Sequence, residues 1–386
     1  MKRAILVLIL TLTATIPMGS PAQAAPPPAV PILSAACDGF LYPDTTGMAQ
    51  GAAGRVHGFV NYARSTDCGN RIFYFEGSGS SWASAATSLR GTVVDVAQDT
   101  TGTYLLHVIN ELSETAELAV TKRATDGTLT RLAVLAPVTG TSGHGKGSIV
   151  ARGGKWLAVW PQAGAAAGDN DLYQYGTLYP ATSSTVQPVP IGAARNNDTA
   201  PALALAPDGT TVLAFTRGAA SSSKIVRVAR TTTGTTYSWQ TAASGVAVSN
   251  DFPNLDIAVS TAGAFVTWSS TVGGIPQVVV ADNLTGRWRT QTELPAFLGS
   301  SWDPSVVADG ARVMAGYSSG DEYPSDAVDI AARTTAAGPW TAVPTGGAVP
   351  PSIDSRGVVG LAAHNNLVTA VVFSGDTLYA VTGLRW

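Results

Sequence analysis

The sequence has few of the residues on which most enzyme and cofactor sites depend. Of its 386 residues, four are histidine and two are cysteine, and charged side chains make up 13% of the chain. Neither the histidines nor the cysteines stand at metal-ligand spacing, which argues against a zinc hydrolase. A Gly-x-Ser-x-Gly elbow is also missing. These absences argue against the most common hydrolase motifs and predict no tightly bound cofactor.

Long apolar runs are missing as well, apart from one at the start of the chain. A positive start precedes an apolar run over residues 4–16, and small residues at Ala22 and Ala24 suit signal cleavage. This pattern is typical of a secretory signal peptide, and the run is too short to cross a bilayer. We therefore expect residues 1–24 to be removed near Ala24, leaving a secreted, extracellular protein without a membrane span.

Basic residues do not dominate the chain. Its formal net charge is −3, and cleavage of the signal peptide would remove two positive charges and give −5. Because nucleic-acid binding favours a basic surface, we expect no nucleic-acid partner.

The only two cysteines are Cys37 and Cys68. Export would place both in an oxidising compartment, which predicts one disulfide between them. Such a bond would close a loop of about 30 residues and stabilise the protein by about 3 kcal/mol.

Internal repetition is the clearest feature that the sequence does have. Three consecutive units of about fifty residues each begin at a proline and lead to a tryptophan. The prolines are Pro201, Pro253 and Pro304, and the tryptophans are Trp239, Trp288 and Trp340. Each unit contains two apolar runs around a tight turn, then an alternating run and a Gly-containing turn. Four short strands per unit are typical of a propeller blade.

Weaker copies of the unit extend the array in both directions and bring the count to seven, or to six without the degenerate first copy. The predicted fold class is therefore all-β, a β-propeller of about seven four-stranded blades, with six as the alternative. We assign residues 45–386 to the propeller and 25–44 to a Pro-rich N-terminal segment. The last unit has almost no fourth strand, so we expect a strand from within 32–42 to complete that blade and to leave no edge unpaired.

The turn before the fourth strand resembles a known motif. In one unit it reads Asp282-Asn283-Leu284-Thr285-Gly286-Arg287-Trp288, which resembles the Asp box of sialidase-type propellers, Ser/Thr-x-Asp-x-Gly-x-x-Trp. The Gly and Trp are kept, but an Asp at the family spacing is not. The inner strand at Trp302-Asp303-Pro304 also resembles that of five-bladed glycoside hydrolases. The resemblance implies the propeller fold and says little about activity, because Asp boxes also occur in non-enzymatic propellers.

Connectivity predicts which face of the propeller is functional. The tight Asp-Gly turns and the degenerate Asp boxes share one face. The start of the first strand and the variable loop between the second and third strands share the other, which we call the loop-rich face. Variable loops on a rigid scaffold commonly carry binding sites, so we expect the site there.

The candidate ligand-binding residues on the loop-rich face are acidic or aromatic. Asp198, Asp251, Asp303 and Asp354 recur just before the first strand of four units, Asp321 and Tyr323 belong to a dense polar loop, and Trp160 and Trp302 are potential platforms. The recurring carboxylates fit Asx-type turns that start a strand. The alternative is a partial ring around the central channel that holds calcium or supplies a general acid.

The resemblance also implies candidate catalytic residues. A sialidase clamps a carboxylate with three arginines, uses a Tyr nucleophile activated by a Glu, and needs an Asp acid/base. The residues that could fill these roles are Arg64, Arg217 and Arg356, Tyr323 with Glu322, and Asp303. Glu322 adjoins Tyr323, however, and neighbours on a strand point to opposite faces. Arg123, Arg230 and Arg333 belong to the repeat consensus and lie toward the other face.

The sequence thus supports two functions. The first is a secreted, monomeric, non-catalytic propeller that binds an extracellular glycan or protein through its loop-rich face. The alternative is a sialidase-like exo-glycoside hydrolase that acts on extracellular glycans. The two differ in whether three guanidinium groups converge beside the central channel.

Overall fold

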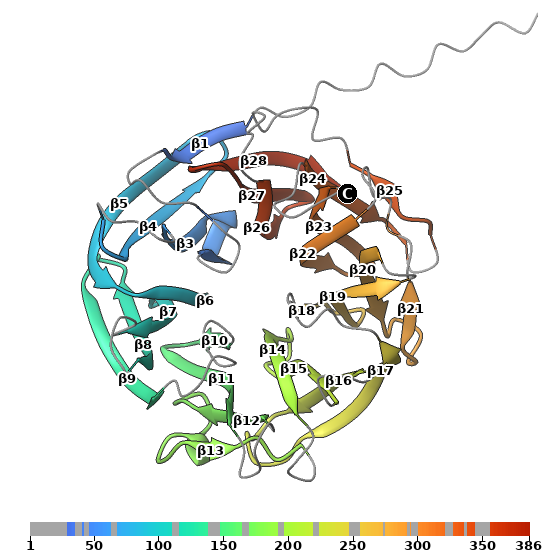
Figure 1. Ribbon diagram of the computed structural model, residues 1–386, viewed down its shortest axis with the longest axis horizontal. Helices are drawn as coiled ribbons and strands as arrows, with labels where there is room; N and C mark the ends of the chain where they lie inside the picture. The colour runs from blue at the N-terminus through green and yellow to red at the C-terminus, as the bar shows by residue number, and fades with distance from the viewer. Residues whose placement is uncertain are drawn as a thin grey trace, which may run out of the picture.

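The computed structural model describes most of the chain after its first 28 residues. The described residues are 29–34, 41, 46–62, 68–109, 116–137, 147–163, 170–191, 197–218, 224–246, 255–272, 275–291, 294, 300–320, 327–335, 338–343 and 356–386. Seven four-stranded antiparallel sheets are arranged radially in a ring (Figure 1). The prediction of seven blades is therefore confirmed, and the six-blade alternative is wrong.

The first four blades follow one another in chain order, each running from its innermost to its outermost strand. Blade 1 contains β2 (Thr46–Gln50), β3 (Val56–Asn61), β4 (Arg71–Ser78) and β5 (Ser81–Arg90). Blade 2 contains β6 (Thr92–Asp99), β7 (Gly102–Ile109), β8 (Glu117–Ala124) and β9 (Leu129–Pro137). Blade 3 contains β10 (Ser148–Arg152), β11 (Lys155–Ala163), β12 (Asn170–Tyr175) and β13 (Gln187–Pro188). Blade 4 contains β14 (Asp198–Leu205), β15 (Thr211–Arg217), β16 (Lys224–Thr231) and β17 (Ser238–Val246).

The remaining three blades keep the same order until the ring closes. Blade 5 contains β18 (Leu255–Val259), β19 (Ala264–Val272), β20 (Ile275–Asp282) and β21 (Arg289–Gln291). Blade 6 contains β22 (Ser300–Asp309), β23 (Arg312–Gly320), β24 (Ala327–Arg333) and β25 (Thr341–Ala342). Blade 7 contains β26 (Arg356–His364), β27 (Leu367–Ser374) and β28 (Thr377–Arg385), with β1 (Ala29–Leu33) outermost.

Blade 7 is completed by the N-terminal strand β1. It pairs antiparallel with β28, with Ala29 opposite Val381 and Pro31 opposite Tyr379. Proline suits this outermost position because it needs no partner for a backbone N–H. A closing strand was expected within 32–42, but β1 starts earlier, at Ala29, and the expected range overlaps only its end.

Helix is limited to two single turns among the described residues, η2 (Ala52–Gly54) and η3 (Pro180–Thr182). No helix in this part of the chain has the length and hydropathy needed to cross a membrane. The predicted signal peptide and Cys37 lie outside the described residues. Cys68 lies in the turn before β4 and is not a free thiol, and its pairing with Cys37 stays a prediction.

The hydrophobic core lies between adjacent blades. Between blades 2 and 3 it contains Tyr104 and Leu106 from β7 and Trp156 and Trp160 from β11. Trp160 is only 3% exposed, so its predicted role as an exposed ligand platform is wrong. Its indole lies on the strand face that turns toward blade 2, where burial of apolar area stabilises the ring.

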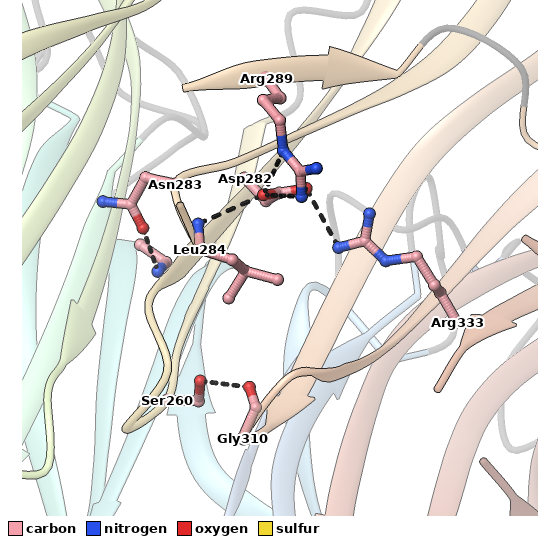
Figure 2. A network of polar contacts seen from close by, with 8 residues as sticks. Ser260, Asp282, Asn283, Leu284, Arg289, Gly310 and Arg333 are labelled. Carbon is pink, nitrogen blue, oxygen red and sulfur yellow. Dashed lines mark hydrogen bonds and ion pairs between the residues drawn. The ribbon is translucent and has the colours of Figure 1, made fainter. Parts of the chain in front are cut away.

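The degenerate Asp box joins two blades through a buried ion pair (Figure 2). Asp282 at the end of β20 accepts a hydrogen bond of 3.1 Å from Arg333 of blade 6 and one of 2.9 Å from Arg289 of its own blade. Arg333 is fully buried. The sequence assigned Arg333 to the repeat consensus, and in the structure this arginine connects blades 5 and 6.

Candidate functional site

The loop-rich face presents one well-defined ion pair among the described residues, at the start of blade 4. Asp198 begins β14 and stands directly opposite Arg217, which ends β15. Arg217 donates from Nε and Nη2 to the two carboxylate oxygens, each at 2.7 Å, and Nη2 also reaches the Ile191 carbonyl at 3.3 Å. Both side chains are largely buried. A guanidinium held in this bidentate manner is already matched to a carboxylate.

Polar side chains of blade 3 continue this cluster. Asn170, at the start of β12, donates from Nδ2 to Oδ1 of Asn197 at 3.0 Å. Burial raises the pKa of Asp198, Arg217 opposes the shift, and the nearby Asp171 charge adds to it. We call Asn170, Asn197, Asp198 and Arg217 the rim cluster. Its formal charge is zero, because the one aspartate pairs with the one arginine.

Asp303 does not precede its strand as the sequence suggested. It lies within β22, in an irregularity of the pairing between Trp302 and Ser305, with a left-handed φ of 48°. The residue is buried and lines the central channel. Its predicted place among the carboxylates just before a first strand is therefore wrong.

Several other predicted site residues cannot be placed. Trp302 and Arg356 lie in β22 and β26, and their side chains fall outside the described part of the structure. Arg64, Asp251, Asp321, Glu322, Tyr323 and Asp354 lie outside the described residues altogether. The predicted convergence of three arginines consequently stays untested, apart from Arg217, which binds Asp198.

The innermost strands of all seven blades line a central channel of about 600 Å³. Among the described residues, its lining contains three carboxyl groups, from Asp95, Asp256 and Asp303, and no basic residue. Asp95 and Asp256 were not among the predicted site residues. Each lies within an innermost strand, β6 or β18, where the sequence pattern is otherwise apolar.

Asp95 starts a chain of hydrogen bonds that crosses three blades. Its Oδ2 accepts from the Ser148 hydroxyl at 2.7 Å and from the Ile149 amide at 2.8 Å, both on β10 of blade 3. Its Oδ1 accepts from the amide of Val96 at 2.7 Å. The Ser148 hydroxyl in turn accepts from the Leu203 amide of blade 4 at 3.0 Å.

Asp256 repeats the arrangement three blades further on. Its Oδ2 accepts from the Ser305 hydroxyl at 3.1 Å and from the Val306 amide at 2.8 Å, both on β22 of blade 6. Ser305 accepts from the Leu361 amide of blade 7 at 3.2 Å. We call these two chains the Asp–Ser relays. One ties blades 2, 3 and 4 together, and the other ties blades 5, 6 and 7.

Burial raises the pKa of both relay carboxyl groups to about 6. The hydrogen bonds from Ser148, Ser305 and the neighbouring amides oppose the shift, since they favour the ionised form. The charge of Asp95 adds to the rise at Asp256. The sequence signal for these residues is an Asp inside an apolar innermost strand, followed one repeat unit later by a Ser in the innermost strand of the next blade.

The described residues contain no group of three or more His, Cys, Asp or Glu side chains that could hold a metal ion. The calcium alternative depended on a ring that included Asp251 and Asp354, which lie outside those residues. It stays a prediction.

Seven radial, four-stranded blades around a channel define the chain as a seven-bladed β-propeller. No family model matches the chain, and no curated protein sequence matches it.

Several solved structures share its fold. An α-L-arabinanase from Penicillium chrysogenum, complexed with arabinobiose, is 11% identical with a TM-score of 0.50, over 92% of this chain and 97% of that one. An α-L-arabinofuranosidase from Fusarium graminearum, complexed with an iminosugar inhibitor, is 12% identical with a TM-score of 0.51, over 93% and 98%. YCF48 from Cyanidioschyzon merolae is 9% identical with a TM-score of 0.50, over 92% and 98%. At these identities the likeness concerns the fold.

Proposed function

We propose that this protein is a secreted propeller that binds a neutral extracellular glycan through the rim cluster on its loop-rich face, without hydrolysing it. The observation that carries the proposal is the bidentate pair of Asp198 and Arg217. The pair leaves the rim cluster without formal net charge, which suits a ligand without charge. The amides of Asn170 and Asn197 supply the mixed donors and acceptors that sugar hydroxyl groups require.

The same pair disfavours a sialidase-like reaction at this position. Such a reaction needs guanidinium groups available to clamp the carboxylate of the sugar. Arg217 instead holds Asp198, with both donor–acceptor distances at 2.7 Å. To bind an acidic sugar, Arg217 would have to leave a partner that is almost completely buried.

Glycoside hydrolysis in the central channel is the second candidate, and the channel carboxyl groups favour it. Most glycosidases use two carboxyl groups, one of which has a raised pKa and protonates the leaving oxygen. Asp95 and Asp256 both line the channel, with their pKa values raised to about 6. However, each carboxylate accepts three hydrogen bonds, two of them from the neighbouring blade, so both groups have a structural role.

Binding measurements with the secreted protein test the proposal. Isothermal titration with neutral oligosaccharides, arabino-oligosaccharides included, should show binding that is lost in the double variant Asp198→Asn/Arg217→Met. The matched control is Arg312→Met, which disrupts an exposed Arg–Asp pair on the opposite face. Binding that persists in the double variant, or a preference for sialosides, would contradict the rim assignment.

Product analysis separates the two candidates. Chromatography after incubation with arabinan and with aryl glycosides should detect no cleavage. Release of sugar that is abolished by both Asp95→Asn and Asp256→Asn, with the fold retained by circular dichroism, would establish the channel hydrolase instead. The N-terminal residue of the exported protein tests secretion, because cleavage near Ala24 predicts a mature chain that begins close to that residue.

A further inference from the structure

Blade 4 has an unusually open outer flank on the side that faces blade 3. Its outermost strand β17 is nine residues long, whereas the outermost strand of blade 3, β13, has only two. Blade 3 therefore cannot cover the whole neighbouring edge. The first four residues of β17 are all exposed.

Trp239 stands on this open flank. It lies directly opposite Ala229 across the β16–β17 pairing, and side chains opposite one another in a sheet point to the same face. Ala229 packs in the core between blades 3 and 4, so the indole also projects on the side of blade 3. With 47% of its surface exposed, it is the most exposed large apolar side chain in the described part of the chain.

The position of this indole is fixed by its surroundings. The β16–β17 pairing continues on both sides of Trp239, from Ser238 to Thr241. The next residue, Gln240, accepts a hydrogen bond of 3.0 Å from the indole N–H of Trp288 in blade 5. The strand that carries Trp239 is therefore anchored to both of its neighbours, and the ring is presented on a rigid support.

A guanidinium group covers one side of the indole. The guanidinium carbon of Arg227 on β16 lies 3.9 Å from the centre of the Trp239 ring. Two of its nitrogens, Nε and Nη1, are buried and have no hydrogen-bond partner among the described residues. None of the ion pairs found among the described residues includes Arg227. Within the part of the chain that the structure describes, this cation is held by stacking on Trp239, with no carboxylate paired to it.

The surroundings of Arg227 disfavour its cationic form, so an added anion would stabilise it. Burial and the nearby Arg217 charge lower the pKa of Arg227, and Asp198 opposes them. Asp198, however, is already bound bidentately by Arg217. An incoming carboxylate would pair with a cation that has no anionic partner among the described residues.

We propose that Trp239 and Arg227 form a second binding site, on the flank of blade 4, for an acidic sugar residue of an extracellular polysaccharide. The apolar C–H groups of the sugar pack against the exposed edge of the indole, and its carboxylate extends past that edge to pair with the guanidinium group. This site differs from the rim cluster in place and in charge. It does not depend on the function proposed for that cluster.

Titration of the full secreted protein with a uronic-acid oligosaccharide, such as trigalacturonate, tests the site. The neutral sugar of the same linkage, without carboxylates, is the matched ligand. The acidic ligand should bind more tightly, and more weakly as salt rises. Trp239→Ala and Arg227→Met should each lower its affinity about tenfold or more, and Arg227→Lys less than Arg227→Met.

Two controls make the outcome decisive. Trp82 on the outer strand of blade 1 donates its indole N–H to the Gly79 carbonyl, so Trp82→Ala removes an outer-strand indole elsewhere and should leave the affinity within about twofold. The rim variant Asp198→Asn/Arg217→Met should still bind the acidic ligand. Equal affinity for acidic and neutral ligands, unchanged affinity in Arg227→Met and Trp239→Ala, or no binding at all would overturn the flank site. If the wild-type protein binds the acidic ligand but no neutral glycan, that result would contradict the rim cluster and leave the flank site unaffected.

Discussion

The hydroxyl of Ser148 on the innermost strand of blade 3 donates a hydrogen bond of 2.7 Å to the carboxylate of Asp95 on the innermost strand of blade 2. Because the same hydroxyl accepts from the Leu203 amide, one serine connects three blades. Ser305 does the same for blades 5, 6 and 7. Six of the seven blades thus have a polar connection at the channel in addition to the apolar packing between blades.

Removal of one relay hydroxyl should destabilise the ring. Ser148→Ala deprives Asp95 of a donor and leaves the buried Leu203 amide without its acceptor. The expected loss in the free energy of unfolding is about 1–3 kcal/mol, measured by urea denaturation. Ser84→Ala on the exposed outer strand β5 is the control and should change it by less than about 0.5 kcal/mol. Equal effects of the two substitutions would show that the relay contributes nothing.

The relay carboxyl groups should make the protein more stable in mild acid. Their pKa values are about 6 in the folded protein, against 3.8 for an ordinary Asp. The folded state therefore binds protons first as the pH falls, and the gain from each group grows below pH 6 and is complete below about 4. Each group contributes up to about 1.4 kcal/mol per pH unit in this range. Asp95→Asn and Asp256→Asn should each flatten the unfolding free energy between pH 7 and pH 4.5, relative to the wild type. A wild-type curve that is parallel to those of both variants would contradict the assignment.

The buried imidazole of His107 should have the opposite effect and make the protein less stable in mild acid. It is fully buried on β7, its Nε2 lies 2.9 Å from the Thr121 hydroxyl, and burial lowers its pKa to about 4. The unfolded chain then binds the proton more readily, so stability is lost as the pH falls from about 6.5 to 4. His107→Gln should remove this loss, seen as a smaller decrease in the urea midpoint between pH 7 and pH 4.5. An unchanged decrease would show that other groups cause it.

Removal of one partner of the buried ion pair between blades 5 and 6 should strongly destabilise the protein. Asp282→Asn leaves Arg333 buried without its carboxylate (Figure 2), and we expect a loss of about 3–5 kcal/mol in the free energy of unfolding. The double variant Asp282→Asn/Arg333→Met should recover part of that loss, because it removes the unpaired charge. Asp309→Asn, which breaks an exposed pair with Arg312, is the control and should cost less than about 1 kcal/mol. A single variant as mild as this control would contradict the buried pair.

The fold could be predicted because each blade repeats the same local pattern. Alternation, tight turns and the recurring Pro and Trp depend on residues close together in the chain, so they are visible in one sequence. The loop-rich face also followed from connectivity, and Asp198 and Arg217 were both among the residues assigned to it. Their mutual pairing was not foreseen, because it depends on the register of β14 against β15.

Contacts between blades could not be predicted in the same way. They depend on which side of its sheet each residue occupies and how deep it lies, and a repeat pattern gives neither for a given side chain. Trp160 was therefore taken as an exposed platform although it packs against blade 2. Asp95 and Asp256 were missed for the converse reason, since a polar residue within an apolar strand has no loop to mark it.

Strand β1 has a consequence for the order in which the protein can fold. It is the first of the described strands to be synthesised, whereas its partner β28 is the last of them. Blades 1 to 6 can form as the polypeptide emerges, but the circle cannot close until β28 has been synthesised. During that interval β1 must stay unpaired and available, so premature capture of this strand by another edge would leave blade 7 with three strands and the ring open.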